Sequence, residues 1–280
     1  MRLPATIVAL CLSTATTRAE PVDLELVLAM DASASISNSE YLLQIKGTAA
    51  AFRDPEVQSA IRSGPYGRIA VAVSLWSDQS LPRIDTGWHV LSDKASIGQF
   101  ADLVRRFKVG ADDKPELGWG GGTFIGEGVM RALEMLDENG HDGLRRVIDV
   151  SGDGPETFFE YAQNIKIGPA RATAQAAGVT INGLPIITNQ QPTLEEYYRT
   201  KVVAGPGAFV VPADGFEEPS LMTRQTSTGS KSGTSSLFSS RTAMGVLTFT
   251  PSEPSAIRSL PPGARLLRIF ASSPEAGSSS

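Results

Sequence analysis

The chain has 280 residues, of which 41% are hydrophobic and 20% charged, so it can bury a substantial core and is too apolar for wholesale disorder. Its formal net charge of -5 argues against a general binder of nucleic acid, whose phosphates attract basic surfaces. No apolar run in the sequence reaches the length of a membrane span, so we expect no transmembrane segment.

The first residues follow the order of a secretory signal peptide. Arg2 precedes the apolar stretch 3–12, and small residues follow up to Ala19. A charged start, a short apolar centre and a small-residue cleavage point are typical of exported proteins, so we predict a signal peptide over residues 1–19. A buried first strand is the alternative. Export would place the protein in a periplasm or outside the cell.

Apolar strands then alternate with helical patterns as far as residue 213. In chain order we predict a strand over 22–30, a helix capped by Ser37 or Asn38, strands over 68–76 and 83–91, a helix capped by Ser92 or Asp93, a helix over 125–138, a strand over 146–150, a helix over 169–177, a strand over 179–187, a helix over 194–203 and a strand over 208–211.

This alternation predicts the fold class. Strands separated by helices pair in parallel with right-handed crossovers. We therefore expect a three-layer, Rossmann-like α/β sandwich over residues 20–218, with a mostly parallel central sheet and helices on both faces. Residues 83–91 alternate and would form the one antiparallel edge strand.

Composition changes after residue 218. Residues 219–280 are rich in serine, carry dispersed prolines and lack a sustained helical stripe, which predicts a disordered tail. The tail holds six Lys or Arg and two acidic residues, so the acidic excess of the chain belongs to the predicted domain.

Three polar loops lie close to the strand ends. Asp31, Ser33 and Ser35 follow the first apolar strand, Thr123 follows three glycines, and Asp153 follows the strand 146–150. In open α/β sheets, ligands bind beyond the carboxyl ends of the strands. Carboxylate and hydroxyl oxygens suit a hard cation such as Mg²⁺ or Mn²⁺ and suit zinc or copper poorly. The sequence therefore predicts a metal site if the loops converge.

The pattern resembles the von Willebrand factor type A (vWA) domain with its metal-ion-dependent adhesion site (MIDAS). The resemblance covers residues 22–218 and extends to an uncharacterised, exported bacterial branch of that superfamily. The motifs that carry it are Asp31-x-Ser33-x-Ser35, Trp76-Ser77, the glycine run ending at Thr123, and the segment 146–155 that contains Asp153.

The resemblance implies a ligand set and a function. Ser33, Ser35 and Thr123 would hold the metal directly, and Asp31 and Asp153 directly or through water. A carboxylate of a partner protein would complete the coordination shell. The implied function is an exported, metal-dependent protein-binding module of the adhesion type, and not an enzyme.

Other interpretations remain open at this point. An Asp after an apolar strand can act as the nucleophile of a Mg²⁺-dependent phosphoryl-transfer hydrolase, but the position two residues after Asp31 is a serine and not the usual second acid. A metal-free structural domain of the cell envelope is a further alternative. Trp119 and Asp78 are candidates for the partner-binding rim, although Trp119 could equally pack over the metal loop.

Overall fold

The computed structural model describes residues 19–78, 84–107, 122–158 and 164–214. The predicted signal peptide up to residue 18 and the predicted tail after 218 lie outside these ranges, as does Trp119. None of the helices in the described part of the chain combines the length and the apolar character of a membrane span.

A mostly parallel sheet forms the centre of the domain, with the strand order β4-β3-β2-β7-β8-β9. The parallel strands are β2 (Leu24–Asp31), β3 (Ile69–Trp76), β7 (Arg146–Gly152), β8 (Thr180–Ile187) and β9 (Ala213–Asp214). At one edge, β4 (Ile84–Asp85) and β5 (His89–Leu91) both pair with β3 in the antiparallel sense. The predicted antiparallel edge is therefore present, in two short pieces.

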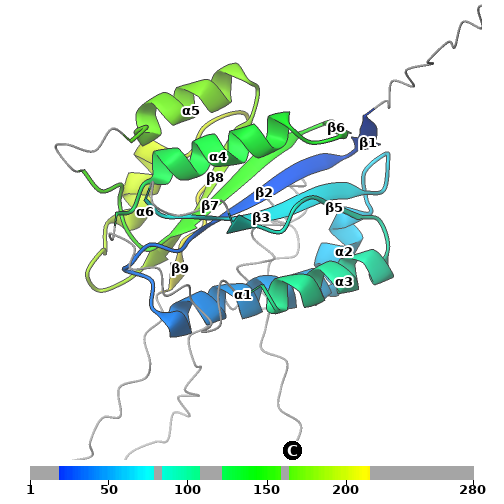
Figure 1. The fold of residues 1–280 in the computed structure, drawn as a ribbon, viewed down its shortest axis with the longest axis horizontal. Helices are drawn as coiled ribbons and strands as arrows, with labels where there is room; N and C mark the ends of the chain where they lie inside the picture. Colours follow the sequence, from blue (N-terminus) through cyan, green and yellow to red (C-terminus); the bar gives the residue numbers. More distant parts are fainter. Residues whose placement is uncertain (1–18, 79–83, 108–121, 159–163, 215–280) are drawn as a thin grey trace, which may run out of the picture.

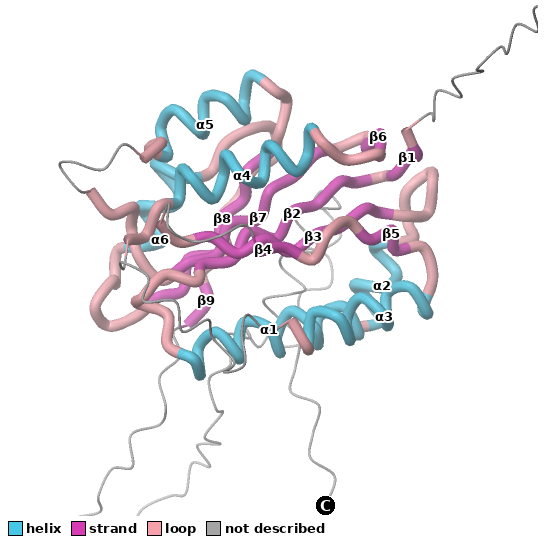
Figure 2. The backbone as a smooth tube through the Cα atoms, viewed as in Figure 1, coloured by secondary structure: helices cyan, strands magenta, loops and turns pink. Residues whose placement is uncertain are grey.

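Helices cover both faces of this sheet (Figures 1 and 2). One face carries α1 (Asn38–Arg53), α2 (Pro55–Ile61) and α3 (Lys94–Arg105). The other face carries α4 (Ile125–Asp137), α5 (Ile167–Ala176), α6 (Leu194–Tyr197) and the π-helix η1 (Tyr198–Val202). The predicted three-layer α/β fold is confirmed.

Side chains fix where two of these helices begin. Ser37 caps α1, where its hydroxyl accepts from the backbone N–H of Glu40 and the Glu40 carboxylate accepts from the N–H of Ser37. Asp93 forms the equivalent reciprocal pair with Ser96 at the start of α3. Each reciprocal pair is a capping box, which satisfies backbone N–H groups that the first turn of a helix cannot pair internally.

Some elements differ from the predictions. No sequence pattern predicted α2 or the two-stranded parallel sheet formed by β1 (Glu20–Val22) and β6 (His141–Gly143). The predicted strand 208–211 is wrong, because this segment makes only an isolated bridge between Val210 and Gly183, and the paired strand β9 starts after Pro212. Proline lacks the N–H that a continuous ladder would need.

The order of the strands creates a switch point beside β2. The chain passes from β2 to β3 on one side and then returns to β7 on the other side of β2. Crossovers that diverge in this way leave a crevice at the carboxyl ends of the two central strands. Asp31 ends β2, and Asp153 directly follows β7, so both predicted carboxylates lie at this crevice.

Candidate metal centre

The loop after β2 forms the first part of the centre. Oδ1 of Asp31 accepts a hydrogen bond from the backbone N–H of Ser33 at 2.7 Å, which closes a tight turn. The turn brings the hydroxyl oxygens of Ser33 and Ser35 to 3.0 Å from each other. Asp31 and Ser33 are buried and Ser35 is exposed, so the cluster runs from the interior to the surface.

The loop after β7 joins this cluster. The hydroxyl of Ser35 donates to Oδ1 of Asp153 at 2.7 Å, across 118 positions of sequence. Asp153 is 8% exposed. The two loops that the sequence placed at neighbouring strand ends are therefore in direct side-chain contact.

Thr123 approaches from the loop before α4. Its hydroxyl oxygen is 3.8 Å from the position that a Cβ would take on Gly154, directly beside Asp153. The backbone of Thr123 is held by Thr157, whose hydroxyl accepts from the Thr123 N–H at 2.9 Å and whose N–H donates to the Thr123 carbonyl at 2.8 Å. Since these bonds use the backbone of Thr123, its hydroxyl remains available to the cluster.

Glu156 fixes the remainder of the loop after Asp153. Its carboxylate accepts from the backbone N–H groups of Gly126 and Ile167, at the starts of α4 and α5. Its own N–H donates to the hydroxyl of Tyr197 at 3.1 Å. A carboxylate at two helix N-termini is favoured by both helix dipoles, so the loop is anchored to three elements of one face.

The buried side chain of Tyr198 lies beside the candidate centre. A Cβ on Gly152 would lie 2.8 Å from the Tyr198 hydroxyl and 2.9 Å from Oδ2 of Asp31, so only a glycine fits between these two groups. The Tyr198 hydroxyl is fully buried and has no hydrogen-bond partner among the described residues. Burial, together with the nearby charges of Asp31 and Asp153, raises its pKa well above the usual value, so the phenol stays neutral.

The donor atoms at this edge can be compared with the ligands that metal ions prefer. Two buried carboxylates and three hydroxyl groups gather at this edge, a set of hard oxygen donors. Across the described ranges, no group of three or more His, Cys, Asp or Glu side chains gathers in a way that could hold a metal ion, at this edge or elsewhere, so a metal here would depend on the hydroxyl oxygens as well. Two carboxylates buried close together favour a compensating cation. The residues present therefore fit a hard divalent ion.

The sequence predicted five donor residues, whose role stays a prediction, and it did not predict the residues that support them. Tyr198, Glu156 and Thr157 act through packing or backbone hydrogen bonds, and no local motif marks such roles. Of the two predicted rim residues, Asp78 is half-buried and lies two positions after the end of β3, at the same edge of the sheet. Trp119 lies outside the described residues, so its role stays a prediction.

Fold and donors together define a class of protein: a three-layer α/β domain with a mostly parallel sheet and a cluster of oxygen donors at the switch point of that sheet. The chain belongs to the family described as a protein of unknown function (DUF1194), whose model matches residues 21–225. No curated protein matches the sequence.

Several solved structures have a similar fold at low sequence identity. Proximal thread matrix protein 1 from the mussel byssus is 16% identical with a TM-score of 0.43, and the match covers 70% of this chain and 42% of that one. The same byssus protein has been solved with a zinc-occupied MIDAS motif. The vWF domain of the pilus tip protein Mfa5 from Porphyromonas gingivalis is 10% identical with a TM-score of 0.43, covering 68% of this chain and 90% of that one.

An aerotolerance-related membrane protein from Bacteroides fragilis is 14% identical with a TM-score of 0.43, covering 68% of this chain and 92% of that one. The matched region spans about two fifths of the byssus protein. At these scores the likeness concerns the fold alone.

Proposed function

We propose that this protein is an exported module that binds a partner protein through a divalent cation, Mg²⁺ or Mn²⁺. The observation that carries the proposal is the contact between Ser35 and Asp153 at 2.7 Å, because it joins the serine loop to the second carboxylate at the switch point. Ser33, Ser35 and Thr123 would hold the ion through hydroxyl oxygens, and Asp31 and Asp153 directly or through water.

The chemistry of this ligand set favours binding. Neutral hydroxyl ligands remove little positive charge from the ion, so it remains strongly electrophilic and attracts an additional anionic oxygen. Ser35 is the exposed member of the cluster, so the partner would approach from that side. The partner chemistry that fits is an Asp or Glu carboxylate.

The burial of Asp31 supports binding over phosphoryl transfer. A nucleophilic carboxylate must contact the phosphorus of its substrate. Asp31 is 0% exposed, and its Oδ1 accepts the N–H of Ser33. Ser33 occupies the position of the expected acid and is also 0% exposed, so neither group is accessible to a phosphate ester.

Thermal unfolding tests the metal site. We expect Mg²⁺ or Mn²⁺ at a hundredfold excess over Kd to stabilise the full chain by about 2.7 kcal/mol relative to EDTA, because the ion binds only the folded state. Thr123→Ala should abolish this shift and keep the fold, since the contacts with Thr157 use the Thr123 backbone. Differential scanning calorimetry with and without metal measures both effects.

The matched control is Thr173→Ala, which removes an exposed threonine hydroxyl from α5. It should keep the full metal-dependent shift. Identical melting curves in EDTA and in either metal, for the unmodified protein, would contradict the proposed site.

A further inference from the structure

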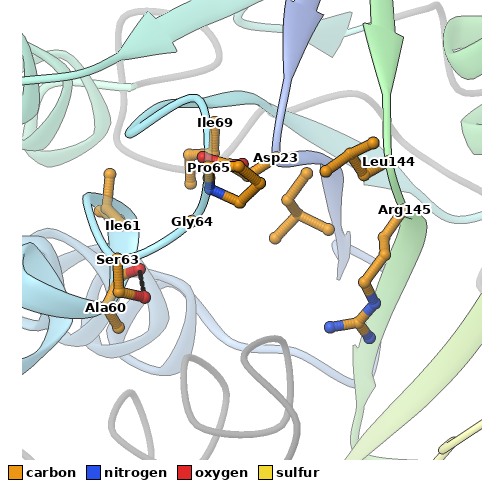
Figure 3. A pocket seen from close by; sticks show the side chains of 10 residues that line it. Asp23, Ala60, Ile61, Ser63, Gly64, Pro65, Ile69, Leu144 and Arg145 are labelled. Atoms are coloured by element: carbon orange, nitrogen blue, oxygen red, sulfur yellow. Dashed lines mark hydrogen bonds between the residues drawn. The ribbon is translucent and has the colours of Figure 1, made fainter.

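An apolar cavity of about 320 Å³ lies at the end of the sheet opposite the candidate metal centre (Figure 3). Its lining includes Leu24 at the start of β2, Ile69 at the start of β3, and Leu144 two positions before β7. Asp31 ends β2 about 23 Å further along that strand. A ligand in this cavity would lie far from the metal centre, so its binding does not depend on the proposed function.

The loop between α2 and β3 holds the walls of the cavity in place. The carboxylate of Asp23 accepts from the backbone N–H groups of Tyr66 at 2.9 Å and of Arg68 at 3.1 Å. Gly64 packs so closely on this carboxylate that a Cβ would lie 2.2 Å from Cγ of Asp23. Across the hollow, Ile61 is buried at the end of α2. The cavity is therefore preformed, as small-molecule sites usually are.

The polar side chains of the wall differ in whether they are already paired. Both oxygens of Asp23 accept backbone N–H groups, and the hydroxyl of Ser63 donates to the carbonyl of Ala60 at 2.8 Å. The guanidinium of Arg145, by contrast, makes no hydrogen bond or ion pair within the part of the chain that the structure describes. Figure 3 shows its side chain reaching from β7, across the hollow from Ala60 of α2.

The charge of Arg145 is only partly compensated. Arg145 is half-buried, and this burial lowers its pKa, although the charge of Asp149 acts to raise it. Asp149 lies four positions further along the chain and is engaged by the amide of Asn182 at 2.8 Å. A half-buried cation gains from a directly bonded anion, and a carboxylate matches the two parallel N–H groups of a guanidinium. The cavity therefore combines an apolar volume with an anion-binding group.

We propose that this cavity binds a medium-chain fatty acid. The alkyl chain would lie among Leu24, Ile61 and Ile69, and the carboxylate would pair with Arg145. An alkyl chain needs no hydrogen-bond partner from the wall, whereas a peptide would bury its own N–H and C=O groups beside side chains that are already engaged. The volume of about 320 Å³ is near the lower limit of small-molecule sites, which favours a medium chain over the longer chains of membrane lipids.

Isothermal titration calorimetry of decanoate into the full chain at pH 8, where carboxylic acids are ionised, tests the site. We expect saturable binding of one decanoate per chain. Hexanoate should bind at least tenfold more weakly, because each buried methylene contributes about fourfold in affinity. Arg145→Gln should weaken decanoate binding at least tenfold. It should leave the affinity for decanol, which has the same chain and no charge, within about twofold, and this retained binding shows that the cavity of the variant is intact.

Two further variants separate the cavity from the rest of the surface. Ala60→Leu enlarges a half-buried side chain of α2 that lines the cavity, so it should weaken both decanoate and decanol at least tenfold. Arg105→Gln makes the same substitution as Arg145→Gln at an exposed arginine of α3, and it should leave both affinities unchanged. An unmodified chain that binds no decanoate, decanoate binding that survives Arg145→Gln, or binding of either ligand that survives Ala60→Leu would overturn the proposal.

Discussion

Gly152→Ala is expected to destabilise the protein by about 3 kcal/mol, at the upper end of the cost of overpacking a core. The added Cβ would lie 2.8 Å from the hydroxyl of Tyr198 and 2.9 Å from Oδ2 of Asp31, with the Trp76 ring at 3.2 Å. These neighbours are buried and belong to β2, β3 and η1, so they have little freedom to move. A fall in Tm of about 5 to 10 °C should follow.

The matched control is Gly154→Ala, two residues further along the same loop. Its Cβ would meet only the Thr123 hydroxyl, at 3.8 Å, which is an ordinary contact distance. We expect a change within about 0.5 kcal/mol. If the two variants have the same Tm, the close packing of Tyr198 against Asp31 across Gly152 is wrong.

Asp149 should make the stability of the protein depend on pH between about 4 and 7. Burial raises its folded pKa to about 7, from an ordinary value of 3.8. Between these values the folded state binds a proton that the unfolded state has lost, so the free energy of unfolding falls as pH rises and levels off above pH 7. A difference of three pKa units corresponds to an upper limit of about 4 kcal/mol.

Asp149→Asn removes this dependence, because the amide cannot ionise and its oxygen can still accept from Asn182. The variant should be more stable than the unmodified protein at pH 8 by up to about 4 kcal/mol. The gain is reduced by the attraction between the Asp149 carboxylate and Arg145, which the amide cannot replace. Urea unfolding at pH 4.5, 6 and 8 measures it. If the free energy of unfolding depends on pH in the same way for both proteins, Asp149 is ionised in the folded protein at all three pH values.

Much of the fold could be predicted because its central strands are buried on both faces. β2 and β3 are almost continuously apolar, and this pattern distinguishes a covered parallel strand from an exposed one. The helix starts at Ser37 and Asp93 were readable because capping uses specific side chains at fixed offsets. Such patterns can be predicted because the interactions that produce them involve residues close together in the sequence.

The remaining features depend on contacts between distant segments. The helix expected over 194–203 changes to a π-helix at Tyr198, where the ring packs on Gly183 of β8: a Cβ there would lie 2.7 Å from the ring. Helical periodicity does not encode that insertion. For the site, order along the chain and the strand ends led to five candidate donors, whose role in metal binding stays a prediction, whereas the packing of Tyr198 beside Asp31 became visible only in the folded structure.

The most direct measurement of the central claim is a titration of Mn²⁺ into the full chain, followed by water-proton relaxation. We expect one Mn²⁺ per chain and a raised water-proton relaxivity. Acetate should lower this relaxivity, because its carboxylate displaces metal-bound water, whereas acetamide should leave it unchanged. Asp153→Ala, which removes the carboxylate that contacts Ser35, should eliminate the bound Mn²⁺. An unmodified protein that binds no Mn²⁺, or that binds it equally after Asp153→Ala, would contradict the account.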